Sequence, residues 1–130
     1  MPRNGDRIVA RARALVGVRF RPQGRARETG LDCVGLAAAA AGVEDVPRDY
    51  ALRGNSLERL AAELEAAGLA RVEVARPGDL LAMEAGPGQL HLGVLSTEGL
   101  IHGDAGLGRV VERPGPVPWP ILSVWRQRED

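Results

Sequence analysis

Three residues in this sequence could together carry out nucleophilic chemistry. They are the single cysteine, Cys33, and the only two histidines, His91 and His102. A thiolate is a strong nucleophile, and an imidazole can remove a proton from a thiol near neutral pH. Each of these residue types is more often structural than catalytic, so their meaning depends on whether the fold brings them together.

Cys33 stands where a helix is expected to begin. Asp32 is a favourable N-cap residue, and an alanine-rich run at 37–41 continues the helix to a stop at Gly42. In the first turn of such a helix the partial positive charge favours a thiolate, and free backbone N–H groups could stabilise an oxyanion. The position alone is also compatible with a buried structural cysteine.

The two histidines fall on a predicted β-hairpin. A two-residue loop at 97–98 would pair His102 with Gly93. His102 would then be diagonal to His91 on the same face of the sheet, where neighbours are roughly 7–8 Å apart. A loop at 98–99 would keep the two histidines on the same face but move them apart, and a three-residue loop would place them on opposite faces unless a bulge intervened. The two-residue loop also puts Asp104 directly opposite His91, so Asp104 is an alternative partner for that imidazole.

Helical patterns precede strand patterns along the chain. Three helices are expected, at 6–17, at 33–41 and, after a capping box at 55–58, up to residue 67. Residues 18–30 are expected to form a loop. Five short strands are expected at 79–83, 90–96, 99–103, 108–112 and 121–125. This order indicates an α+β fold with N-terminal helices packed on an antiparallel sheet of about five strands, in one domain spanning 1–130.

Five segments resemble, in order, the motifs of the NlpC/P60 cysteine peptidases. Residues 32–36 match the nucleophile motif D-C-x-G-L, and residues 91–94 resemble the H-x-G-V strand with the catalytic histidine. Residues 76–81 resemble the P-G-D-L entry to the first strand, residues 99–102 the strand with the third polar residue, and residues 17–21 the upstream G-x-P-Y segment. The compact length and the residues after the aromatic of this last segment are most similar to the phage-tail and gene-transfer-agent branch.

The resemblance implies a papain-like NlpC/P60 fold and assigns roles to the three chemical residues. Cys33 would be the nucleophile, His91 the general base and His102 the residue that orients His91. Tautomer and ring orientation of a catalytic imidazole are set by such a third group.

Substrate contacts are implied for Phe20, Arg21 and Asp32. Two positions depart from the family pattern, because its usual Tyr is Phe20 here and the Pro before it is Arg19. A hydroxyl that the Tyr would lend to the substrate or the oxyanion is therefore missing. Trp119 and Trp125 are interpreted as packing residues of the core or the sheet ends.

The same resemblance implies a hydrolase that cleaves amide bonds in the stem peptides of peptidoglycan, with no cofactor. Two histidines and one cysteine could in principle bind zinc, but nothing else in the sequence completes such a site, and no metal is expected. The expected partners are a peptidoglycan peptide and the structural proteins of a phage-tail-like particle that opens the cell wall for DNA entry. The alternatives are a catalytically inactive plug or adaptor of such a tail, and a cytoplasmic peptidase that recycles muropeptides.

Composition and charge argue against several other classes. The net charge is zero and no apolar run reaches the ~18–20 residues of a membrane helix, so neither nucleic-acid binding nor membrane insertion is expected. No signal peptide is recognised, which predicts synthesis in the cytoplasm and association with a virion or tail. Arginines are concentrated at the N-terminal end, beside an acidic remainder with which they could pair. Alternatively, four of them could bind carboxylates of the stem peptide: Arg19, Arg21, Arg25 and Arg27.

Overall fold

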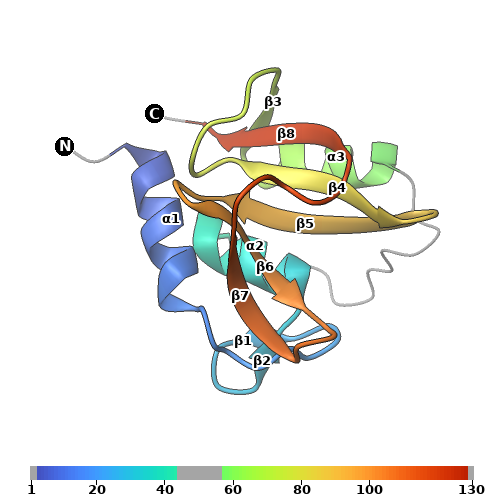
Figure 1. Ribbon diagram of the computed structural model, residues 1–130. Coiled ribbons are helices and arrows are strands. Elements are labelled where there is room, and N and C mark those ends of the chain that lie inside the picture. The colour runs from blue at the N-terminus through green and yellow to red at the C-terminus, as the bar shows by residue number, and fades with distance from the viewer. Residues whose placement is uncertain (1–2, 44–56, 129–130) are drawn as a thin grey trace.

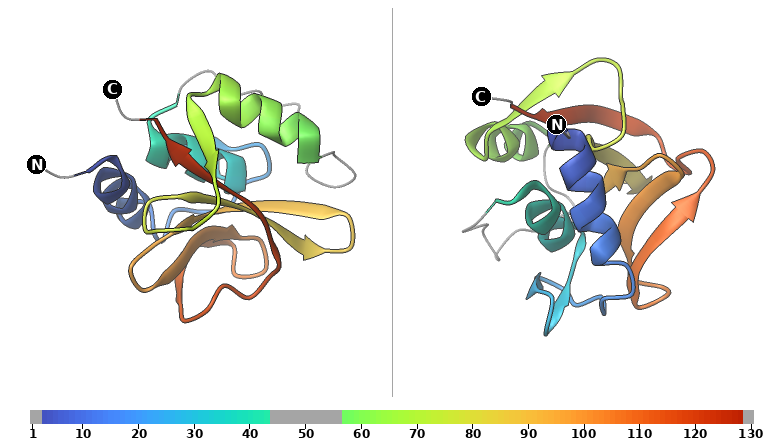
Figure 2. Two further views of the ribbon diagram at one scale, coloured as in Figure 1. Left: turned by 90° about the horizontal axis from the view of Figure 1, so that it is seen from above. Right: turned by 90° about the vertical axis from the view of Figure 1, so that its left-hand side faces the viewer.

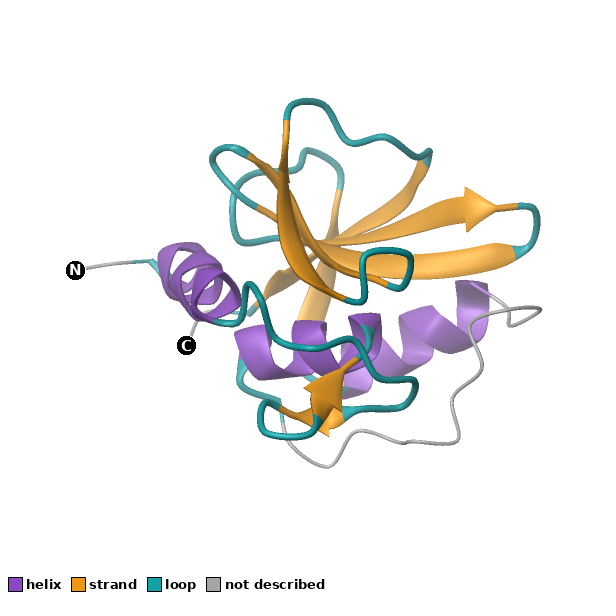
Figure 3. Cartoon of the chain, turned by 60° about the horizontal axis from the view of Figure 1, so that its bottom comes forward, coloured by secondary structure: helices purple, strands orange, loops and turns teal. Residues whose placement is uncertain are grey.

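Three helices lie against one face of an antiparallel sheet in the computed structural model, which describes residues 3–43 and 57–128 (Figure 1). Among these residues the helices are α1 (Asn4–Ala14), α2 (Cys33–Ala41) and α3 (Leu57–Ala66). Figure 3 shows α2 and α3 beneath the strands and α1 at the edge of the sheet. The left-hand view in Figure 2, from above, shows the same layer of helices and layer of strands.

The main sheet has six strands within the described residues, in the order β3-β8-β4-β5-β6-β7, and every neighbouring pair is antiparallel. In chain order they are β3 (Leu69–Val72), β4 (Leu80–Gly86), β5 (Gln89–Leu95), β6 (Gly99–Asp104), β7 (Arg109–Pro114) and β8 (Ile121–Gln127). Strands β4 to β7 form a meander, and β8 returns to pair between β3 and β4. A short ladder of β1 (Arg25–Ala26) and β2 (Gly30–Leu31) precedes α2.

The α+β class and the antiparallel sheet expected from the sequence are confirmed. All five expected strands are present as β4 to β8, and α1 covers most of the helix expected at 6–17 but ends before Gly17. The sheet gains a sixth strand, β3, because residues 69–72 pair with β8 from the other end of the chain. The expected loop at 18–30 also contains the β1–β2 ladder. The capping box expected at 55–58 begins at positions that lie outside the described residues.

The two faces of the sheet are buried by different parts of the chain. On the helix side, strand residues pack with the inward faces of the helices to form the main core, which includes Leu36, Leu80, Leu92, Ile101 and Trp125. On the opposite face a smaller cluster consists of Leu81, Met83, Leu100 and Val124. The Pro-rich connection between β7 and β8, residues 115–120, crosses this second face in front of β4 and β5 (Figure 1). Because successive side chains alternate between faces, the register of each strand decides which layer a residue joins.

Two glycines of the motif segments allow close backbone contacts. A Cβ on Gly35 would lie 2.1 Å from the carbonyl oxygen of Gly24, so glycine is needed where the first turn of α2 meets the loop before it. Gly78 has a φ of 95°, and a Cβ there would lie 2.2 Å from the Cα of Gly5. These contacts set how closely α2 approaches its preceding loop, and how closely α1 approaches the start of β4.

Candidate active site

The N-terminus of α2 places Cys33 at an opening between β5 and β6. Within the described residues these strands pair only near their hairpin loop, at 94–95 with 100–101. Beyond that point, the backbone of Leu92 hydrogen-bonds the Cys33 thiol, and a Cβ on Gly103 would lie 3.5 Å from the Cys33 nitrogen. Cys33 therefore sits between the two diverging strands, and it is only 2% exposed.

Asp32 caps α2 and holds the loop before it. Its Oδ1 accepts a hydrogen bond from the backbone N–H of Gly35 at 2.8 Å, which confirms the expected N-cap. The same oxygen pairs with the Arg25 guanidinium at 2.8 Å, and Oδ2 accepts from the backbone N–H of Gln23 at 2.9 Å. Three donors thus engage this carboxylate. Asp32 acts on the site by orienting α2 and its loop, and the substrate contact expected of it stays a prediction.

The β5–β6 hairpin brings His91 and His102 into direct contact. The backbone N–H of Ser96 donates to the carbonyl oxygen of Gly99 at 2.8 Å, which closes a two-residue loop at 97–98, one of the loops that the sequence left possible. His91 Nε2 and His102 Nδ1 are 3.0 Å apart. His102 is buried and His91 is half-buried. The contact uses one ring nitrogen of His91 and leaves its Nδ1 for another partner.

An open pocket of about 350 Å³ is lined by Cys33, His91 and His102 together. This volume falls in the range of about 300–1,000 Å³ that is usual for small-ligand sites. The other lining residues come from the loop before α2, from β4, β5 and β6, and from the Pro-rich connection: Phe20, Pro22, Gln23, Asp32, Ala85, Gln89, Gly103, Asp104, Ala105 and Trp119. The fold therefore gathers at one pocket residues that are far apart in the sequence.

Trp119, expected from the sequence to be only a packing residue, lines the pocket. Its ring lies edge-to-face against both imidazoles, with centroid distances of 5.3 Å to His91 and 5.2 Å to His102. Trp125, by contrast, is 1% exposed in the main core, and its indole N–H donates to Ser123 Oγ at 2.9 Å. A tryptophan directly flanked by prolines was the one local sign that the two tryptophans differ.

Comparison with known proteins identifies the fold. No protein-family model matches the sequence, and no curated protein sequence matches it significantly. The chain is similar to the NlpC/p60 domain of the peptidoglycan hydrolase SagA, with 25% identity and a TM-score of 0.57 over 86% of this chain and 90% of that one. It is also similar to the peptidoglycan hydrolase RipB of Mycobacterium tuberculosis, with 21% identity and a TM-score of 0.61 over 100% of this chain and 70% of that one. The fold is that of an NlpC/P60 domain.

A third solved NlpC/P60 structure covers nearly all of both chains. This is the P60 domain of antigen MAP1204 from M. avium subspecies paratuberculosis, with 18% identity and a TM-score of 0.59 over 95% of this chain and 93% of that one. The NlpC/P60 fold is thus shared along the chain, from the α1 region to β8. The chemistry of this particular site depends on its own burial and charges.

Burial has the largest effect on the pKa values of the groups in this pocket. It raises the pKa of the Cys33 thiol to about 12, although backbone hydrogen bonds from Leu92 and Val34 act in the opposite direction. Burial, and then the neighbouring His102, lower the pKa of His91 to about 4. Burial also lowers the pKa of His102. These shifts favour the neutral thiol and the neutral imidazoles.

Burial acts against the thiolate expected at the helix N-terminus, because it raises the pKa of Cys33. The partial charge of a helix end stabilises an anion by only about 0.3–1 kcal/mol where solvent screens it. Removing a thiolate from water at a 2% exposed position costs more than this, so the desolvation effect wins. Burial thus favours a neutral thiol and a neutral imidazole in the same pocket, with the proton moving during the reaction.

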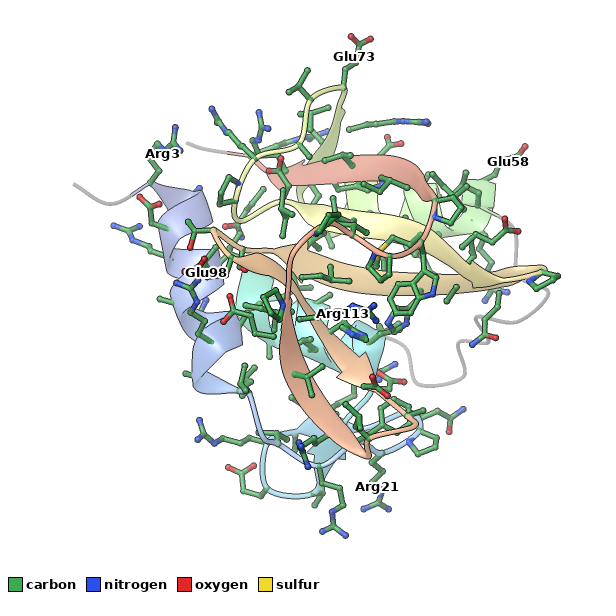
Figure 4. All side chains as sticks on the ribbon, viewed as in Figure 1. Arg3, Arg21, Glu58, Glu73, Glu98 and Arg113 are labelled. Carbon is green, nitrogen blue, oxygen red and sulfur yellow. The ribbon has the colours of Figure 1, made fainter. Side chains whose placement is uncertain are left out.

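The substrate-binding residues expected from the sequence are only partly brought together. Phe20 lines the catalytic pocket. Arg21 lies outside it, in an adjoining groove of about 470 Å³ lined by residues 21–26 and 29. Figure 4 shows its side chain projecting away from the body of the molecule. Of the four arginines expected to bind carboxylates, Arg25 is already paired with Asp32.

Asp104, the alternative partner of His91, also lines the pocket. Its Oδ1 accepts the backbone N–H of Leu107 at 2.9 Å, an interaction that closes the turn between β6 and β7. Its charge raises the pKa of His91 against the stronger effects of burial and His102. The ring nitrogen of His91 is contacted by His102, so the geometry favours His102 as the orienting group.

Two further observations concern the described residues alone. Within 3–43 and 57–128, no group of three or more His, Cys, Asp or Glu side chains is arranged to hold a metal ion. In the same part of the chain, no helix has the length and apolar character needed to cross a membrane.

Proposed function

We propose that this protein is a cysteine hydrolase that cleaves amide bonds in the stem peptides of peptidoglycan. The observation that carries the proposal is the 3.0 Å contact between His91 Nε2 and His102 Nδ1 in the same pocket as Cys33. A nucleophile, a base and a group that orients the base are the parts that an activated cysteine requires. The substrate class is supported by the structural neighbours, since SagA and RipB are described as peptidoglycan hydrolases.

The contact between the histidines can select the tautomer that catalysis needs. When His91 Nε2 carries the ring proton and donates a hydrogen bond to His102 Nδ1, the Nδ1 of His91 has no proton and can accept one. This nitrogen takes the proton of Cys33 as the sulfur attacks the amide carbon and the carbonyl π electrons move to oxygen. The Cys33 backbone N–H lies in the first turn of α2, where N–H groups have no partner within the helix, and it can donate to the oxyanion.

The second half of the reaction returns each group to its starting state. As the C–N bond breaks, the His91 imidazolium gives its proton to the leaving amine, and the acyl group stays on Cys33 as a thioester. A water molecule then attacks the thioester with His91 as general base, which releases the acid product and restores the thiol. His102 accepts the Nε2–H hydrogen bond throughout and holds the ring plane of His91.

Isolated sacculi provide the direct test. The purified protein is incubated with them, and the soluble fragments are identified by mass spectrometry. We expect stem-peptide fragments from the wild-type protein and none from Cys33→Ala, with circular dichroism showing that the variant is folded. A folded wild-type protein that releases no fragment over a broad pH range would contradict hydrolysis and favour an inactive tail adaptor.

We further propose that the enzyme acts as a component of a phage-tail-like particle. The support is the resemblance of residues 17–21 to the tail-associated branch of NlpC/P60 proteins. Particles purified from producer cells should contain the chain at a few copies, and its deletion should reduce DNA entry without blocking particle assembly. Absence of the chain from intact particles, measured by mass spectrometry, would overturn this role and favour muropeptide recycling.

A further inference from the structure

The Pro-rich connection, residues 115–120, is a short segment held firmly at both ends. Prolines occupy every second position, on both sides of Trp119, and each fixes its own φ angle. Its first N–H donates to the carbonyl oxygen of Glu98 at 3.0 Å. Its last carbonyl oxygen accepts the backbone N–H of Glu84 at 3.0 Å. Few backbone conformations remain for such a segment, so the position of its aromatic ring is well defined.

Three rings meet where this connection crosses the sheet. The interplanar angles are 88° between His91 and His102, 83° between His91 and Trp119, and 85° between His102 and Trp119. All three centroid distances are 5.2–5.3 Å. Each pair is in the edge-to-face arrangement that aromatic rings favour. A change in the plane of one imidazole would therefore disturb two contacts at once.

We propose that Trp119 is a positioning residue whose indole covers the His91–His102 hydrogen bond, fixes both ring planes and keeps water away from it. The catalytic consequence rests on the function proposed above, but the positioning itself does not. A hydrogen bond between two neutral imidazoles competes poorly with water, and it is stronger where water is excluded. Water in its place could bond to either nitrogen of His91, and both tautomers would then be populated.

The groups that surround the histidines make this role specific to Trp119. His91 faces Cys33 from α2 and His102 and Asp104 from β6. His102 is affected by the charges of Asp104 and of Arg113 from β7. The Pro-rich connection brings no titratable group of its own. The Pro-rich connection therefore acts on His91 and His102 through the Trp119 indole, which restricts their ring planes and excludes water.

Nitrogen NMR of the histidine rings tests the proposal without any substrate. The chain has two histidines, so protein labelled with ¹⁵N-histidine shows few ring signals, and these report tautomer and protonation directly. In the wild-type protein we expect a single tautomer for His91 and an Nε2 proton that exchanges slowly with water. In Trp119→Leu, which keeps an apolar side chain but loses the ring, we expect mixed tautomers and a His91 pKa that moves up towards its ordinary value. Trp119→Phe should lie between them.

Kinetics supply a second readout on the same variants. Trp119→Leu should lower kcat about tenfold, because a mixed population of His91 tautomers weakens the general base. Trp119→Phe should recover most of the kcat. Ring signals and titration in Trp119→Leu that match the wild type would overturn the proposal. If that variant does not fold, a fast-exchanging Nε2 proton in the wild-type protein would overturn it equally. A shifted titration in a protein with no hydrolytic activity would uphold the positioning and reject the hydrolase.

Discussion

At the scale of single residues, burial moves the pKa values of Cys33 and His91 in opposite directions. Burial raises the pKa of the Cys33 thiol to about 12, and burial and the neighbouring His102 lower the pKa of the His91 imidazole to about 4. His91 must be neutral to accept the thiol proton, so activity should be present above about pH 4 and lost as the pH falls through that value. Because no thiolate forms near neutrality, kcat/KM should show no rise between pH 7 and 9.

Alkylation by iodoacetamide tests whether the pKa of the Cys33 thiol is raised. The rate for Cys33 should increase about tenfold for each pH unit through the neutral and alkaline range, since each unit raises the thiolate fraction tenfold below the pKa. The denatured protein serves as the control, and its rate should level off near the ordinary pKa of a cysteine. A plateau in the folded protein at or below neutral pH would show that the thiolate is preformed.

Two neighbours of His91 should differ in their importance. His91→Ala should reduce kcat by on the order of 10²–10⁴, the usual contribution of a general base. His102→Ala should come close to this loss, because His102 contacts the ring nitrogen at 3.0 Å. Asp104→Ala should cost less activity and should mainly loosen the β6–β7 turn that its carboxylate closes. If Asp104→Ala reduces kcat as much as His102→Ala, the assignment of the orienting residue is wrong.

At the scale of elements, the site depends on how closely α2 approaches its neighbours. A Cβ on Gly35 would lie 2.1 Å from a backbone oxygen of the preceding loop, which cannot move aside as a flexible side chain could. Gly35→Ala should therefore destabilise the protein by about 1–3 kcal/mol, the usual cost of overpacking, despite the better helix propensity of alanine. Urea unfolding followed by circular dichroism measures the loss.

Gly103→Ala is the matched control for this change. Its Cβ would come no closer than 3.4 Å to any atom, which is ordinary van der Waals contact beside the same end of α2. We expect its free energy of unfolding to stay within about 0.5 kcal/mol of the wild type. Equal stability of the two variants would mean that the contact between α2 and the loop is not tight in solution.

At the scale of the whole molecule, charge is unevenly distributed, with arginines concentrated in the N-terminal segment. Arg21 projects from the groove that adjoins the catalytic pocket, whereas Arg25 is held by Asp32. If Arg21 contacts a stem-peptide carboxylate, Arg21→Gln should raise KM about threefold, because an exposed ion pair contributes less than about 1 kcal/mol.

The dependence of KM on ionic strength distinguishes a lost ion pair of Arg21 from a change in folding. The KM of the wild-type protein should rise with ionic strength, and Arg21→Gln should show a weaker rise, because exposed charges are screened. Arg71→Gln, on the exposed edge strand β3, is the matched control and should leave both KM and its salt dependence unchanged. If KM depends on ionic strength identically in all three proteins, Arg21 is an exposed surface residue that does not contact the substrate.

The sequence by itself determined the features that depend on neighbours along the chain. The N-cap at Asp32 and the helix after it follow from the local preferences of Asp and Ala. For His91 and His102 the sequence predicted the hairpin but left its loop length open, and the two-residue loop of the structure places them on one face. Such signals act over a few residues, so they survive in any tertiary context that keeps the hairpin and the helix.

The tertiary structure alone decided what depends on segments distant in the sequence. Burial of Cys33 between β5 and β6 raises the pKa of its thiol and so acts against the expected thiolate, because desolvation is a property of packing and not of the helix end. Trp119 contacts the two imidazoles because the chain after β7 crosses the sheet. The sequence of the Pro-rich connection does not indicate which strand residues it packs against.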